Sequence, residues 1–293
     1  MLQEVFSVVT PVFIIAAIGF VWIKADQPFD NTTISSLVMM IGSPCLIFSS
    51  LTSNPPEWEV LRDVLASAAL AIISILAFAA IFLKIIGWKF TTYAASLSHA
   101  NTGNMGLPLV LLAFGPEGLA LGMAFFFVNS ISQFTVGMTI ASGSFKPQQL
   151  LKQPVIWSVL AVMICILGDL TPPQCLTNTT QILGGLTIPA MLLMLGTSIA
   201  RLKATSIRET LVISILRLLL GFGVGHLAVW LFDLQGILAG VVILQCTMPA
   251  AVFNYVFADR FNREPEKVAA VVLISTVLSI LTLPLLVAYV LTI

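Results

Sequence analysis

Ten residues at positions 99–108 interrupt a long apolar segment with polar side chains and glycines. Asn101 and Asn104 carry amide groups that both donate and accept hydrogen bonds. Gly103 and Gly106 tolerate backbone angles that other residues resist. In hydrocarbon every backbone N–H and C=O must be bonded within the protein, so a helix is broken only where protein or a water-filled cavity surrounds the break. The pattern indicates a place where something is bound.

A second interruption occurs at positions 245–254, in the other half of the chain. Two interrupted spans in matching positions of two halves are the best pointer in a sequence to a transporter site. Pro108 suits the first turn of a new half-helix, where its missing N–H costs little, and Pro249 plays the matching part. The two interrupted spans are therefore expected to cross near the middle of the bilayer.

Both second half-helices would point their N-termini at this crossing, where free N–H groups and the positive end of the helix dipole attract an anion. The first half-helices would end there with carbonyl oxygens suited to a cation. The sequence therefore predicts a site for a small carboxylate that needs no charged side chain, with a proton or a sodium ion as candidate coupling ion. The positions expected to form it are Asn101, Gly103, Asn104, Gly106, Pro108, Asn129, Gln133, Gln245, Pro249, Ala250, Asn254 and Ser275.

Several polar side chains leave alternatives open. The asparagines either bind the ligand or bond the backbone groups that the breaks set free. His99 either carries a coupled proton or stays neutral and satisfies backbone groups. Arg217 either attracts an anion or, as we favour, extends toward the cytoplasmic surface, and His226 is interpreted as a hydrogen bond between packed helices.

The composition shows what must position these residues. Of 293 residues, 58% are hydrophobic and 9% are charged, and the mean hydropathy is +1.05. A soluble domain carries roughly 25% charged residues, so lipid solvates this chain. All 13 acidic residues map to predicted loops, termini or span ends, so a carboxylate proton relay is not evident. The four cysteines have no metal-ligand spacing, and we expect no metal, no cofactor and no nucleic-acid partner.

Windows of about 20 apolar residues predict ten membrane-spanning helices. They cover residues 4–24, 32–53, 63–86, 91–113, 117–142, 154–169, 178–200, 208–232, 235–258 and 267–292. The odd-numbered connections then hold 11 of the 13 basic residues, and the even-numbered connections and the termini hold only Arg62. By the positive-inside rule the odd connections are cytoplasmic and both termini are outside.

Five spans in each half make the halves inverted relative to each other, as residues 1–145 and 150–293. A faint repeat agrees: Asn31 and Asn178 each open an Asn-Thr-Thr triplet that could cap a helix, and Pro44 and Pro189 follow at similar distances. We expect an all-α membrane protein made of two inverted repeats.

The motif in the fourth span resembles the signature of the auxin efflux carrier family. It consists of Asn101, Gly103, Gly106, Leu107 and Pro108. The resemblance implies a 5+5 inverted repeat with crossed broken helices 4 and 9, as in sodium/proton antiporters and bile-acid symporters. It also implies a scaffold of spans 1, 2, 6 and 7, a mobile transport domain of spans 3–5 and 8–10, an elevator-type motion and a homodimer. Members of the family carry organic anions, such as malate or malonate in bacteria and auxin in plants.

The connection between the halves, at positions 142–153, is much shorter than in the plant PIN-FORMED carriers, so the chain resembles a bacterial member in the inner membrane. Two other readings stay open: a sodium-coupled organic anion symporter of the bile-acid type, and a transporter-like ligand sensor without net flux. An intramembrane enzyme is not expected, because the sequence lacks HExxH, a GxSxG with a partnered histidine, and DxxxD.

Overall fold

The protein is described from a computed structural model, which covers residues 2–144, 153–168, 170–202 and 206–293. Over these residues the chain is helical and forms no strand. Seven of the described helices are long and apolar enough to cross a membrane, so this is a multi-pass membrane protein. Of the predicted connection between the halves, residues 145–152, with Lys146 and Lys152, lie outside the described residues, as does Lys203.

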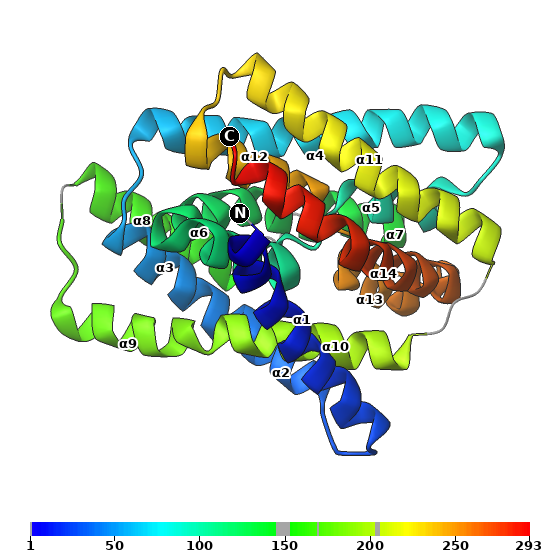
Figure 1. Ribbon diagram of the computed structural model, residues 1–293, viewed down its shortest axis with the longest axis horizontal. Helices are drawn as coiled ribbons and strands as arrows, with labels where there is room; N and C mark the ends of the chain where they lie inside the picture. Colours follow the sequence, from blue (N-terminus) through cyan, green and yellow to red (C-terminus); the bar gives the residue numbers. More distant parts are fainter. Residues whose placement is uncertain (1, 145–152, 169, 203–205) are drawn as a thin grey trace.

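Fourteen α-helices and three π-helical segments make up the described fold (Figure 1). They are α1 (Leu2–Lys24), α2 (Asn31–Leu37), the π-helix η1 (Val38–Gly42), α3 (Ser43–Ser53), α4 (Trp58–Ile86), α5 (Phe90–Ser98), the π-helix η2 (Thr102–Gly106), α6 (Leu107–Ser132), the π-helix η3 (Gln133–Gly137), α7 (Met138–Ser142), α8 (Pro154–Leu167), α9 (Gln174–Gly185), α10 (Thr187–Arg201), α11 (Ile207–Leu231), α12 (Gly236–Thr247), α13 (Val252–Arg260) and α14 (Pro265–Val290).

The stretch Thr102–Ser142 counts as a single apolar span of 41 residues. At 1.5 Å per residue it would measure about 60 Å, twice the thickness of the hydrocarbon core. Its helical geometry is interrupted at Gly115, where φ is 65° and ψ is −158°, and Pro116 follows. This interruption falls between the predicted fourth and fifth spans.

The predicted caps of the second and seventh spans are wrong. Asp30 caps α2, since its carboxylate accepts from the backbone N–H of Thr32 at 2.9 Å. Asn31 instead accepts from the hydroxyl of Thr197 at 2.8 Å and so joins α2 to α10. Asn178 lies inside α9, where its side chain accepts from Gln174 at 2.7 Å. The first triplet therefore begins α2 without capping it, and the second does not mark the start of α9.

The helices pack in two groups. In the first, α1 packs along α10, and α3 packs against α8 and α9. In the second, α11 packs against α4, α12 and α14, and α4 also packs against α5 and α6. Figure 1 shows the long helices α4 and α11 side by side at one edge of the molecule, with α9 and α10 along the opposite edge. The groups meet where α1 contacts α14 and where α10 contacts η2.

Charged side chains gather at the two ends of the second group. At one end, Lys267 lies 3.1 Å from Glu209 and 3.2 Å from Glu264, and Lys89 lies 3.3 Å from Glu264. These four residues come from three places that are far apart in the sequence. The ion pairs therefore hold the loop before α5, the start of α11 and the start of α14 together.

The opposite ends of α4 and α11 are acidic. A surface hollow there is lined by the connections that follow α3 and α11 and by the middle of α6. Its acidic residues are Glu57, Asp63, Glu117 and Asp233. Lysine–glutamate ion pairs thus lie at one end of these helices, and a hollow with four acidic residues lies at the other.

Candidate functional site

The two interrupted segments pair with each other through their backbones. Helix α5 ends at Ser98 and α12 ends at Thr247. Between them, Ala100 and Ala250 form an isolated antiparallel bridge. The N–H of Asn101 donates to the carbonyl of Pro249 at 2.7 Å, and the N–H of Ala251 donates to the carbonyl of His99 at 3.1 Å. This pairing satisfies backbone groups that the breaks would otherwise leave unbonded in an apolar interior.

A helical segment starts on each strand of this bridge. The π-helix η2 begins at Thr102 and leads into α6, which holds Pro108 in its first turn, and α13 begins at Val252. The first N–H groups of a helix have no acceptor within it, so those of Thr102, Gly103 and Asn104 have none within η2. The donors at the first break therefore lie four to six positions before Pro108.

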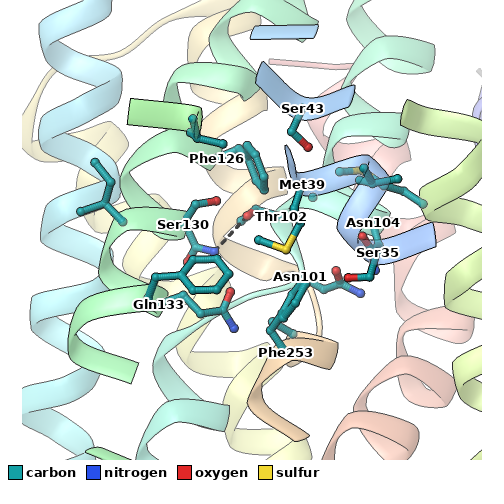
Figure 2. A pocket seen from close by; sticks show the side chains of 18 of the residues that line it. Ser35, Met39, Ser43, Asn101, Thr102, Asn104, Phe126, Ser130, Gln133 and Phe253 are labelled. Atoms are coloured by element: carbon teal, nitrogen blue, oxygen red, sulfur yellow. Dashed lines mark hydrogen bonds between the residues drawn. The ribbon is translucent and has the colours of Figure 1, made fainter. Parts of the chain in front are cut away.

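A cavity opens beside the bridge and has a volume of about 50 Å³, enough for a few water molecules. One wall comes from α2, η1, α3, α8 and α10, and the other from η2, α6, η3 and the residues around the second break. In Figure 2, Ser35, Met39 and Ser43 of the first wall lie across from Asn101 and Thr102 of the second. The described residues that line the cavity include no Asp, Glu, Lys or Arg.

Two buried donors face this cavity without a partner. Asn101 is 4% exposed, and its Nδ2 finds no hydrogen-bond acceptor among the described residues. Ser43 is 2% exposed, and its hydroxyl is unpartnered over the same part of the chain. Buried polar groups are nearly always bonded, so an orphan donor beside a cavity marks a place for a ligand or an ordered water. One of these donors comes from each wall.

The structure brings five of the predicted site residues into the cavity wall: Asn101, Gly103, Asn104, Asn129 and Gln133. The predicted residues that do not line it are His99, Gly106, Pro108, Gln245, Pro249, Ala250, Asn254 and Ser275. Most of the second set supports the first set from behind, through hydrogen bonds or close packing.

The supporting hydrogen bonds connect the two breaks. Asn129 donates through Nδ2 to the carbonyl of Ala100 at 3.1 Å and to the hydroxyl of Thr102 at 3.0 Å. Gln133 donates to Asn254 at 3.1 Å, and Asn254 donates to the carbonyl of His99 at 3.3 Å. These amides hold the backbone of the first break in place.

Ser275 and Gln245 lie behind the second break. The hydroxyl of Ser275 accepts from the N–H of Ala250 at 3.1 Å. Gln245 is fully buried and donates to the carbonyl of Gly122 at 3.4 Å, while its Oε1 has no partner within the described chain. A Cβ atom at Gly106 would lie 2.1 Å from that oxygen, so a larger residue there would displace the Gln245 side chain from its position between α12 and η2. Gln245 therefore sets the fit of the two helices at the crossing.

His99 is fully buried, with a hydroxyl on each side of its ring. Nδ1 lies 2.9 Å from the Ser98 oxygen, and Nε2 lies 3.0 Å from the Ser132 oxygen. Because Ser98 donates its proton to the carbonyl of Ala94, Nδ1 must be the donor to Ser98. In the neutral ring Nε2 then accepts from Ser132 and the ring proton lies on Nδ1, whereas in the protonated ring Nε2 donates to Ser132.

The favoured interpretation of Arg217, an extension toward the cytoplasmic surface, is wrong. Arg217 is 1% exposed and points inward, where its guanidinium donates to the carbonyls of Leu97, Cys246 and Met248. The interpretation of His226 is confirmed, since it bonds the hydroxyl of Tyr289 on α14 at 2.8 Å.

The sequence interpretation missed the first wall of the cavity. Ser35, Met39 and Ser43 come from the second predicted span, and Met191 and Met194 come from the seventh. The sequence signal was Pro44, which directly follows Ser43, and the structure shows a π-helix just before it, between Val38 and Gly42. A π-helical turn inside a helix is frequently found at functional sites.

Comparisons with known proteins agree with a transport role. A family model described as membrane transport protein matches residues 4–149 and 137–287. An uncharacterized transporter of Methanothermobacter thermautotrophicus is 25% identical over 272 residues, which cover 87% of this chain and 88% of the relative. The uncharacterized transporter MJ1031 of Methanocaldococcus jannaschii is 22% identical over 271 residues, covering 86% of this chain and 87% of the relative.

Proposed function

Since this chain belongs to the membrane transport protein family of the auxin efflux carriers, we propose that it is a secondary active transporter of small organic anions. The observation that carries the proposal is the cavity beside the paired breaks. Its wall holds Nδ2 of Asn101, which has no partner among the described residues, and the first N–H groups of η2, which have no acceptor within that helix. Donors of this kind bind a carboxylate, and the described wall has no carboxylate that would repel it.

The architecture that we propose has ten spans in a 5+5 inverted repeat, with broken helices 4 and 9 crossing at the bridge. Dividing Thr102–Ser142 at Gly115 adds one span to the seven long ones. The shorter apolar helices Pro154–Leu167 and Gly236–Thr247 add two more, the second continuing as α13 after the break. The positions of Pro44 and Pro189, each in the first turns of the helix that follows a discontinuity, support the repeat.

The two groups of helices support a division into a scaffold and a transport domain. The first group corresponds to spans 1, 2, 6 and 7, and the second to spans 3–5 and 8–10. The cavity lies between them, so a rigid shift of the second group against the first would carry a bound anion with it in an elevator-type motion. We also propose a homodimer that forms through the scaffold.

The distribution of charges supports the proposed orientation. Lys89, Glu264 and Lys267 lie together at one end of the second group, and the acidic hollow lies at the other. Arg201 donates to the carbonyl of Phe29 at 2.6 Å, which joins the first and seventh connections. We place the basic end in the cytoplasm of a bacterial inner membrane, with both termini outside.

We propose His99 as the residue that carries a coupled proton, and its two hydroxyl neighbours determine which hydrogen bonds must change when it takes one up. To take up a proton, Nε2 must become a donor, and the hydroxyl of Ser132 must turn to accept from it. We therefore expect His99→Gln to abolish the response of transport to a pH gradient while anion binding at constant pH is kept. A variant that still responds to the gradient would place the proton on another group.

The test is a thermal-shift screen of mono- and dicarboxylates on the purified protein, at two pH values, with sodium or choline as the cation. Ligands found in this way are then followed by counterflow in proteoliposomes. Asn101→Ala and Asn104→Ala should lose binding and transport together. Binding without counterflow by the unaltered protein would favour a ligand sensor, and sodium-dependent uptake would favour a symporter of the bile-acid type.

A further inference from the structure

Arg217 joins the ends of two helices behind the proposed anion site. It is the only Asp, Glu, Lys or Arg side chain that is buried among the described residues. Nη1 donates to the carbonyl of Leu97 in α5 at 2.5 Å, and Nη2 donates to the carbonyl of Cys246 in α12. Nε donates to the carbonyl of Met248, the residue that follows α12, at 3.2 Å.

These carbonyls lie at the negative ends of their helices. The last carbonyls of a helix have no N–H partner within it, and together they carry about half a negative charge. Two such ends, of α5 and α12, therefore balance about one positive charge. No carboxylate pairs with Arg217 in the part of the chain that the structure describes, so the two helix ends are its counter-charge.

A glycine on α11, the helix that carries Arg217, lets the end of α12 come close enough for these hydrogen bonds. Gly221 lies one turn beyond Arg217 on α11, and a Cβ atom there would be 2.1 Å from the carbonyl oxygen of Cys246. The same Cβ would be 2.9 Å from Nη2 of Arg217. Only a glycine at this position lets the end of α12 approach both α11 and the guanidinium.

We propose that Arg217 is a built-in replacement for a coupling cation and acts as a positioning residue for the anion site. Carbonyl ends of half-helices at a crossing are where a transporter binds sodium. Here the guanidinium takes those carbonyls, fixes the ends of α5 and α12, and so fixes the bridge on which Asn101 and η2 depend. The anion site then needs no bound sodium, and this last step rests on the proposed function.

Loss of the guanidinium should therefore create a requirement for a cation from solution. In Arg217→Ala the carbonyls of Leu97, Cys246 and Met248 keep their negative potential but lose their donor. A guanidinium ion fits the space and the hydrogen bonds, and sodium fits the carbonyl oxygens alone. Arg217→Lys keeps the charge with a compact head group, so it should remain independent of sodium.

The first experiment uses no substrate. Thermal unfolding of the purified protein is measured in four solutions. They are sodium chloride, choline chloride, choline chloride with guanidinium chloride, and choline chloride with urea, each additive at about 10 mM, far below denaturing levels. Arg217→Ala should unfold at a lower temperature in choline and recover by about 5 °C when the cation is near 100 times its Kd. The wild type, Arg217→Lys and Arg208→Ala, an exposed arginine on the same helix, should not respond.

Three outcomes would overturn the proposal: equal responses in the wild type, recovery with urea as well as guanidinium, or an unstable Arg217→Ala that no cation restores. If Arg217→Ala does not fold, the Arg217→Lys variant provides the test. A need for sodium in Arg217→Lys would overturn the proposal, and stability that is independent of sodium would support it.

The second experiment separates this proposal from the proposed function. Counterflow of malonate is measured in proteoliposomes with sodium or choline on both sides. We expect the wild type to exchange malonate in choline and Arg217→Ala to need sodium or guanidinium. If the wild type does not move malonate but the cation-dependent stability is seen, then the anion assignment fails and the role of Arg217 stands.

Discussion

The backbone N–H of Asn101 donates to the carbonyl of Pro249 over 2.7 Å, so the first interruption of the chain is held by the second. The main chain of Asn101 is thereby committed to the bridge, while its side-chain Nδ2 has no acceptor among the described residues. The main chain and the side chain of Asn101 thus have different roles. Its backbone maintains the fold, and its side chain faces the cavity.

The first prediction concerns Asn101→Ala. Removing a buried donor that has no partner leaves no other group unsatisfied. The free energy of unfolding should therefore stay within about 0.5 kcal/mol of the wild-type value. Loss of a hydrogen bond to a carboxylate should weaken anion binding by about 10- to 100-fold. Isothermal titration with the best carboxylate of the thermal-shift screen checks this, and unchanged affinity would remove Asn101 from the site.

The second prediction concerns Asn129→Ala, which should behave in the opposite way. The amide of Asn129 bonds the carbonyl of Ala100 and the hydroxyl of Thr102. Its removal leaves buried acceptors without a donor and should destabilise the protein by about 1–3 kcal/mol. Thermal unfolding without ligand measures the effect, and a stability equal to that of Asn101→Ala would contradict the distinction between the two asparagines.

The third prediction compares two glycines of α11. Gly221→Ala places a methyl group against the carbonyl of Cys246 and should cost about 1–3 kcal/mol, because α11 and α12 must separate. Gly223→Ala is the matched control, since a Cβ there meets no atom within 4 Å among the described residues. It should be neutral or stabilise the helix by up to about 1 kcal/mol. Equal unfolding temperatures for the two variants would show that the close approach is not needed.

Much of the helical pattern could be predicted from the sequence. Predicted limits for the first, third and eighth spans, at residues 4–24, 63–86 and 208–232, lie within five residues of α1, α4 and α11. Hydrophobic runs define such helices because lipid accepts little else. The interruptions near Asn101 and Pro249 were also visible, since polar residues and glycines in an apolar run are conspicuous.

Other features depended on contacts between distant residues. Nothing local shows that Arg217 meets the carbonyls of Leu97 and Cys246, because these come from other helices. The sequence predicted carbonyl oxygens suited to a cation at the crossing. It did not show that the guanidinium of Arg217 donates to such carbonyls. In the same way, Ser43 belongs to the cavity only because α3 packs near the bridge.

The fourth prediction concerns the pH dependence of stability at the basic end. The hydroxyl of Thr92 donates to Glu264 at 2.6 Å, and Lys267 and Lys89 lie 3.2 and 3.3 Å away. The Thr92 hydrogen bond first, and then the two lysines, hold the pKa of the Glu264 carboxyl below its usual value. Since the folded pKa lies below the unfolded one, the unfolded state binds more protons over the interval between them.

The contribution of the ionised Glu264 carboxylate to the free energy of unfolding should therefore be fully present above its unfolded pKa. It should be lost as the pH falls through its folded pKa. Glu264→Gln should unfold at a lower temperature than the wild type near pH 7, and the two curves should converge below about pH 4. Thr92→Val should show the same trend with a smaller difference, because the lysines remain. Thermal unfolding between pH 3.5 and 7.5 (a range set around the ordinary carboxyl pKa of about 4.3) decides the matter, and a constant difference between wild type and Glu264→Gln would exclude a role for the ionised carboxylate.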